Sequence, residues 1–234
     1  MLYTRILPFN PLETNCIVLW ADDAATCALV DPGISSDEEE TVLLSFLQEH
    51  GLTPEAILLT HGHFDHVWGV ERLLARFPVP VYLHPDDKGI VADGGYGPKL
   101  AQSISMLRHD FPSQDIADGD VLHFADTDWK VLHTPGHTPG GVSYYSEENS
   151  LLLSGDTLFA GCIGRTDFPG GDYDVLMQSI RTRLLTLPGD TDVIPGHGQP
   201  TGIAREGMYN PFLLPFNEPD PDWDAQDGIP VRGL

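Results

Sequence analysis

Short apolar runs alternate with polar breaks along most of the chain, which is typical of a protein that mixes strands and helices. Glycine or proline closes many of these runs. The apolar runs predict strands at 15–20, 26–30, 56–60, 79–83, 121–124, 129–133, 142–146, 151–154 and 192–194. Apolar positions spaced three or four apart predict helices at 35–50, 67–77 and 172–187. Residues 85–112 are ambiguous, and we expect short helices there.

The two halves of the chain share a short repeated pattern. In each half a strand ends at an aspartate beside small residues, Asp31 and Asp156, and a later strand runs into a histidine flanked by glycine, His61 and His197. Two similar halves would bring these strand ends to one shared edge. The alternating elements predict an α/β layered domain.

The end of the chain differs in composition from the rest. Residues 211–234 are rich in proline and aspartate, and we interpret them as an extended C-terminal tail that follows a domain over residues 1–210.

The charge balance narrows the range of partners. The chain of 234 residues has 12 Lys and Arg against 35 Asp and Glu, a formal net charge of −23. Few cations are available to hold a phosphate backbone or an anionic membrane, so we expect a small-molecule substrate, with no nucleic acid and no membrane as partner. The sequence leaves the oligomeric state open.

The N-terminal segment and the cysteines suggest a location. The N-terminal segment has no apolar core typical of a signal peptide, no run approaches the ~18 apolar residues of a membrane span, and the 3 cysteines show no paired spacing. We therefore expect a cytoplasmic protein.

The segment 60–66, Thr-His-Gly-His-Phe-Asp-His, carries the strongest chemical signal. It follows a predicted buried strand and opens a predicted helix. His61 and His63 alternate along extended backbone and therefore project the same way, whereas Asp65 and His66 lie at the helix start. One short segment thus supplies two pairs of ligands aimed at two neighbouring points, which predicts a metal site with two ions.

Three later positions complete the candidate ligand set. His137, Asp156 and His197 each follow a predicted strand and lie beside glycine. Imidazole and carboxylate ligands suit two divalent ions, with Zn²⁺ favoured and Fe or Mn as alternatives. We expect one ion to be held by His61, His63 and His137, the other by Asp65, His66 and His197, and Asp156 to bridge them. Two ions ~3.5–4 Å apart would acidify a bridging water for hydrolysis, and we assign Asp65 a catalytic role as well.

These motifs resemble the metallo-β-lactamase superfamily and, more narrowly, its glyoxalase II (hydroxyacylglutathione hydrolase) branch. The matching segments are 60–66, 134–138, 155–159, 161–162 and 195–198. The resemblance implies a four-layer αββα sandwich, all seven ligand positions, and hydrolysis of a thioester such as S-lactoylglutathione or a related acyl thiol. Asp31 matches an early aspartate of the superfamily that orients a ligand. The Asn210–Leu213 segment resembles the ending of short bacterial type II glyoxalases.

Two features qualify the resemblance. Classical glyoxalase II enzymes hold glutathione with basic residues of a C-terminal helical domain, whereas proline-rich acidic sequence follows His197 here, so glutathione recognition does not carry over. Arg165 lies where glyoxalase II relatives have a basic residue near the substrate. It is our candidate for binding a substrate carboxylate, and an ion pair with Asp167 is the alternative interpretation.

Two other functions remain as alternatives. The segment 161–168 is similar to a run in persulfide dioxygenases, which are oxidoreductases that use one Fe(II) in the same fold. Such an enzyme does not need the second group of ligands, which is complete here, so the hydrolase is favoured. A non-catalytic metal-binding protein or a flavodiiron-type scaffold is less favoured, since flavodiiron proteins usually carry an added flavin module.

Overall fold

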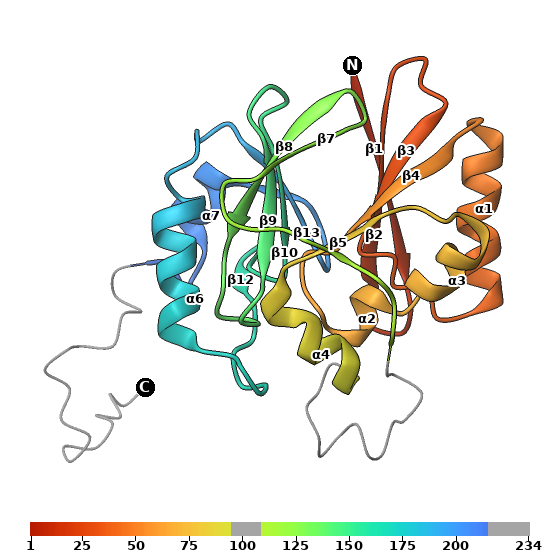
Figure 1. Cartoon of the computed structure of the whole chain (residues 1–234). Helices are drawn as coiled ribbons and strands as arrows, with labels where there is room; N and C mark the ends of the chain where they lie inside the picture. Colours follow the sequence, from red (N-terminus) through yellow and green to blue (C-terminus); the bar gives the residue numbers. More distant parts are fainter. Residues whose placement is uncertain (95–108, 215–234) are drawn as a thin grey trace, which may run out of the picture.

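The computed structural model describes residues 1–94 and 109–214 of the chain. Two six-stranded sheets face each other, and helices cover the outer face of each sheet (Figure 1). This arrangement confirms the predicted α/β fold with its four αββα layers.

The first sheet is built from the N-terminal half of the chain. Its strands are β1 (Leu2–Phe9), β2 (Thr14–Ala21), β3 (Thr26–Val30), β4 (Thr53–Leu58), β5 (Val81–Leu83) and β6 (Gln114–Asp115). They lie side by side in chain order. The first three strands pair antiparallel, and β3 to β6 pair parallel. The ends of β3 and β4, which precede candidate site residues, therefore reach the same edge.

The second sheet comes from the C-terminal half. Its strands are β7 (Val121–Phe124), β8 (Thr127–His133), β9 (Val142–Ser146), β10 (Leu151–Gly155), β13 (Asp192–Pro195) and β14 (Thr201–Gly202). Their order is β14-β13-β10-β9-β8-β7, and β10 pairs parallel with β13. A small hairpin of β11 (Leu158–Phe159) and β12 (Cys162–Ile163) follows β10. The ends of β10 and β13 thus also point the same way.

Helices fill the outer layers and one end of the sandwich. They are α1 (Asp37–Glu49), α2 (Phe64–Val67), α3 (Val70–Arg76), the 3₁₀ turn η1 (Pro85–Asp87), α4 (Lys88–Asp93), α6 (Tyr173–Ser179), the π-helical turn η3 (Ile180–Leu184) and α7 (Ile203–Tyr209). Figure 1 shows α1 and α3 on one side of the sandwich and α6 and α7 on the other. Across residues 1–94 and 109–214, no helix has the length and apolar character needed to cross a membrane.

The period of two along the strands produces three apolar cores between the four layers. In β2, Cys16 and Val18 pack with the helices α1 and α3, while Ile17 and Leu19 face the second sheet. Trp129 and other large residues of the second sheet fill the middle core from the opposite side. A third core lies between the second sheet and α6, η3 and α7.

The elements differ from the sequence-based expectation at several points. Strand β1 was not expected, and nor were β14 and α7. The predicted helix at 172–187 divides into α6 and η3. Short helices do occur within 85–112, but residues 95–108 of that segment lie outside the described residues. Most of the predicted tail, 215–234, lies outside them as well.

We predict that the middle core contributes much more to stability than the exposed face of the same hairpin. Val131, in β8, is fully buried between the sheets, whereas Val121, in β7, is 59% exposed. Val131→Ala should lower the free energy of unfolding by about 2 kcal/mol, from lost burial plus a cavity. Val121→Ala should change it by less than about 0.5 kcal/mol. Chemical denaturation of both variants checks this, and equal losses would contradict the layer assignment.

Candidate metal centre

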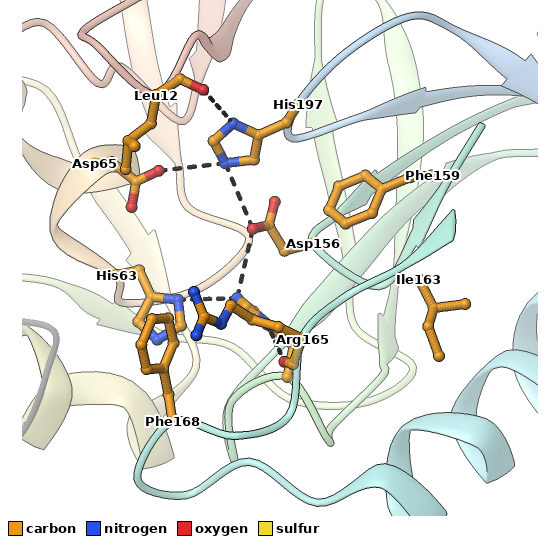
Figure 2. A pocket seen from close by; sticks show the side chains of 10 residues that line it. Leu12, His63, Asp65, Asp156, Phe159, Ile163, Arg165, Phe168 and His197 are labelled. Carbon is orange, nitrogen blue, oxygen red and sulfur yellow. Dashed lines mark hydrogen bonds and ion pairs between the residues drawn. The ribbon is translucent and has the colours of Figure 1, made fainter. Parts of the chain in front are cut away.

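The seven candidate ligands come together at one edge of the two sheets. His61 and His63 follow β4, Asp65 and His66 lie in α2, and His137, Asp156 and His197 follow β8, β10 and β13 respectively. Figure 2 shows four of them, His63, Asp65, Asp156 and His197, facing a single pocket. The pattern repeated in the two halves of the sequence therefore corresponds to two sheets whose strand ends meet.

Three histidines form the first group. His63 Nδ1 is 3.0 Å from His61 Nε2 and 2.9 Å from His137 Nε2. The ring of His63 is nearly perpendicular to the other two, at 86° and 87°. Nitrogens bound to one tetrahedral zinc ion at 2.0–2.1 Å lie roughly 3.3 Å apart. The spacing of these three nitrogens therefore suits a single ion at their centre.

The second group combines one carboxylate with two histidines. Asp65 Oδ2 is 3.5 Å from His66 Nε2 and 3.2 Å from His197 Nε2, and the two Nε2 atoms are 3.2 Å apart. Thr14 Oγ1 donates a hydrogen bond of 2.9 Å to Asp65 Oδ2 and so fixes the carboxylate. These three ligand atoms have the spacing of a second ion site.

Asp156 lies between the two groups. Its Oδ2 is 3.5 Å from both His137 Nε2 and His197 Nε2, and its Oδ1 is 3.5 Å from His66 Nε2. Oδ1 is buried and accepts no hydrogen bond from any residue that the structure describes. A buried carboxylate oxygen without a hydrogen bond is costly. A bound cation would satisfy it, so the residues present fit a metal centre bridged by Asp156.

Backbone carbonyls orient two of the histidines. His137 Nδ1 donates to the carbonyl oxygen of Arg165 at 2.7 Å, and His197 Nδ1 donates to that of Leu12 at 2.9 Å. A neutral imidazole that donates through Nδ1 carries its lone pair on Nε2. In its neutral form each ring therefore directs an Nε2 lone pair into the site, as a metal ligand requires.

Asp31 orients two more. Its Oδ2 accepts from His66 Nδ1 at 3.0 Å and from Thr60 Oγ1 at 2.6 Å. Thr60 Oγ1 in turn lies 3.1 Å from His61 Nδ1 and accepts a hydrogen bond from it when Nδ1 carries the proton. One buried carboxylate thus directs the Nε2 of a histidine from each group. This geometry places Asp31 where the sequence analysis expected an orienting residue.

Burial and neighbouring carboxylates divide four of the candidate histidines into two classes by the direction of their pKa shifts. Burial lowers the pKa of His63 to about 3, and it lowers that of His61 well below its usual value, so both rings are neutral. Burial also opposes protonation of His66, but Asp65 and Asp156 outweigh it and raise its pKa to about 9. The pKa of His197 rises to about 11 for the same reason. Metal ions therefore compete with protons at the second group.

A sequence model of the metallo-β-lactamase superfamily matches residues 9–197, which contain all seven ligand positions. The chain belongs to the metallo-β-lactamase superfamily. This fold binds a dinuclear metal centre, in agreement with the two ligand groups found here.

Curated relatives of this superfamily match almost the whole chain. It is 40% identical over 215 residues to the probable metallo-hydrolase YqgX of Bacillus subtilis, covering 91% of this chain and 98% of the relative. It is 36% identical over 212 residues to hydroxyacylglutathione hydrolase GloC of Haemophilus influenzae, covering 89% and 97%. The GloC match is consistent with the glyoxalase II branch that the motifs resemble.

Solved structures of the superfamily match at similar levels. BLEG-1, described as a B3 metallo-β-lactamase, has a TM-score of 0.80 and 37% identity, covering 90% of this chain and 99% of that one. TTHA1623, solved in a di-iron-bound form, has a TM-score of 0.76 and 39% identity, covering 90% and 100%. The chain thus shares its fold with both proteins.

A pocket with a volume of about 430 Å³ opens beside the metal centre (Figure 2). Apart from the candidate ligands and Arg165, its lining is apolar, with Leu12, Phe159, Ile163 and Phe168. The only cationic side chain other than histidine among the described lining residues is Arg165.

The guanidinium of Arg165 already has partners. Its Nε and Nη2 each donate to the Asp167 carboxylate at 2.7 Å, and its Cζ lies 3.8 Å over the ring of Phe168. The ion pair considered in the sequence analysis is therefore present, and the guanidinium lines the pocket at the same time.

A further cluster of His84, Asp86 and His133 does not have the geometry of a metal site. The two imidazole rings are stacked, with centroids 4.3 Å apart and an angle of 7° between their planes. A metal ion lies in the plane of each imidazole that binds it, so two parallel stacked rings cannot share one ion. His133 Nε2 also lies 2.9 Å from the carbonyl oxygen of Pro139. Stacking and hydrogen bonding account for this pair.

We predict that Asp156→Asn weakens metal binding at both groups, because the carboxylate oxygens reach ligands of each. The purified protein should contain two divalent ions per chain, and the variant should retain less than one. Asp190→Asn, at an exposed loop position, is the matched control and should retain both. Elemental analysis after dialysis measures the content. An unchanged content in Asp156→Asn would show that this residue does not bridge the ions.

Proposed function

We propose that the chain is a two-metal thioester hydrolase that acts on a small molecule such as S-lactoylglutathione or a related acyl thiol. The observation that carries the proposal is the complete pair of ligand groups with Asp156 between them. The likeness to GloC, which is described as a hydroxyacylglutathione hydrolase, supports the choice of a thioester.

The chemistry divides between the ions and the chain. When bound, the two ions supply an acidified water and a Lewis acid for the carbonyl oxygen. The water adds to the thioester carbonyl carbon, the C–S bond breaks, and a carboxylic acid and a thiol leave. A thiolate is a good leaving group, so the pocket needs no strong general acid. Asp65 lines the pocket beside His197. In addition to its role as a ligand, we assign it the transfer of the proton that the attacking water gives up.

The second ligand group favours hydrolysis over a one-iron oxidation. A mononuclear iron enzyme has no need for Asp65, His66 and His197 to converge, yet their ligand atoms lie 3.2–3.5 Å apart. We propose zinc as the metal because imidazole-rich sites with one or two carboxylates suit it. Iron is the competing metal, since a similar structure holds two irons.

We predict that the protein loaded with two equivalents of zinc hydrolyses acyl thiols. Loss of thioester absorbance with S-lactoylglutathione measures the rate, and the Asp65→Asn variant should lose at least a hundredfold in kcat. A chromogenic β-lactam belongs in the same screen, since a similar structure is described as a β-lactamase. Oxygen uptake with a glutathione persulfide and Fe(II) tests the dioxygenase. No thioesterase activity at full metal occupancy would refute the proposal.

We further propose that Arg165 binds a carboxylate of the substrate, exchanging its partner Asp167 for the ligand. Arg165→Ala should raise KM for S-lactoylglutathione about tenfold and leave kcat nearly unchanged, as expected for an interaction made equally in the ground and transition states. The same variant should leave KM unchanged for a lactoyl thioester of a small uncharged thiol. Arg205→Ala, exposed on α7, is the control. Equal changes for both substrates would contradict the carboxylate contact.

A further inference from the structure

A buried carboxylate outside the ligand set lies between two of the ligand loops. Asp87 ends the turn η1, and its side chain is completely buried. Its Oδ2 accepts from Gly62 N at 2.8 Å and from Thr138 Oγ1 at 2.7 Å, and its Oδ1 accepts from Gly140 N at 2.6 Å. All three donors belong to loops that carry metal-binding histidines.

The hydrogen-bond donors to Asp87 lie in segments that follow strands of different sheets. Gly62 stands between His61 and His63, in the segment that follows β4 of the first sheet. Thr138 directly follows His137, in the segment after β8 of the second sheet. The three histidines of the first group therefore come from two different sheets. Asp87 is hydrogen-bonded to both loops at once.

The two glycines fit closely around this carboxylate. A Cβ atom at Gly62 would lie 2.8 Å from the backbone oxygen of Asp87, and one at Gly140 would lie 2.7 Å from its Oδ1. Any side chain at either position would push the loop away from Asp87. The close approach of backbone to carboxylate is thus built into both loops.

We propose that Asp87 is a positioning residue that holds the three-histidine group in its metal-binding geometry. A buried carboxylate is costly unless hydrogen bonds compensate it, and three donors do so here. Asp31 directs histidines through their ring nitrogens, whereas Asp87 acts through the backbone of the loops. Asp31 reaches one histidine of each group, whereas Asp87 contacts the two loops that carry the three histidines of the first group. We therefore expect the Asp87 contact to act mainly on the first group.

The test measures zinc affinity at each group separately, by competition with a chromophoric chelator and without turnover. In the full-length His197→Ala protein the intact group is the three-histidine group, and in His137→Ala it is the second group. Asp87→Asn should weaken zinc binding about 10- to 100-fold in the first background, as loss of a ligand-orienting contact does. It should change affinity less than threefold in the second.

Asp86→Asn is the matched control, because Asp86 belongs to the same turn but its side chain is 59% exposed. It should leave both affinities unchanged. If Asp87→Asn does not fold, as judged by near-ultraviolet circular dichroism, Thr138→Val removes one of the three hydrogen bonds and should give a smaller loss confined to the first group. Unchanged affinity at the first group, or equal losses at both, overturns the proposal. Because no substrate is present, the result does not depend on the proposed thioesterase activity.

Discussion

The convergence of imidazole nitrogens and carboxylate oxygens on two points is the constraint on which the rest of the site depends. Nitrogen lone pairs about 3 Å apart repel one another unless a cation lies between them. Hydrogen bonds on the far side of the rings maintain this arrangement. Backbone carbonyl oxygens accept from the Nδ1 atoms of His137 and His197, and Asp31 accepts from that of His66. The outer hydrogen bonds therefore fix the orientation of the rings before any metal binds. In the second group a metal ion then replaces the protons that Asp65 and Asp156 favour on His66 and His197.

The sandwich places these groups by bringing strand ends from two sheets to one edge. The middle apolar core fixes the two sheets relative to each other, and the outer cores fix the helices on each sheet. Short segments after the strands then carry the ligands. Beside the site, polar contacts also cross between the sheets, such as those of Asp87 with Gly62 and Thr138, or of Asn15 with the carbonyl oxygen of Pro195. These cross-links give the binding site a rigidity that flexible loops alone would lack.

The features that the sequence predicted are those that depend on residues close together along the chain. Short apolar runs predicted most of the strands, and the segment 60–66 predicted two ligand pairs, His61 with His63 and Asp65 with His66, which the fold brings together. Strand β1 escaped prediction because it is an edge strand with several exposed positions, interrupted by Pro8. Asp87 escaped because its partners lie 25 to 53 residues away along the chain. A single aspartate in a polar turn gives no local sign of burial, so only the folded structure identifies its role.

The most direct test of the account is a crystal structure of the metal-loaded protein with anomalous data collected at the zinc, iron and manganese edges. The account predicts two peaks roughly 3.5–4 Å apart, one among His61, His63 and His137 and the other among Asp65, His66 and His197. The Asp156 carboxylate should contact both. A single peak, or two peaks with Asp156 bound to only one of them, would contradict the two-metal centre from which the proposed hydrolysis follows.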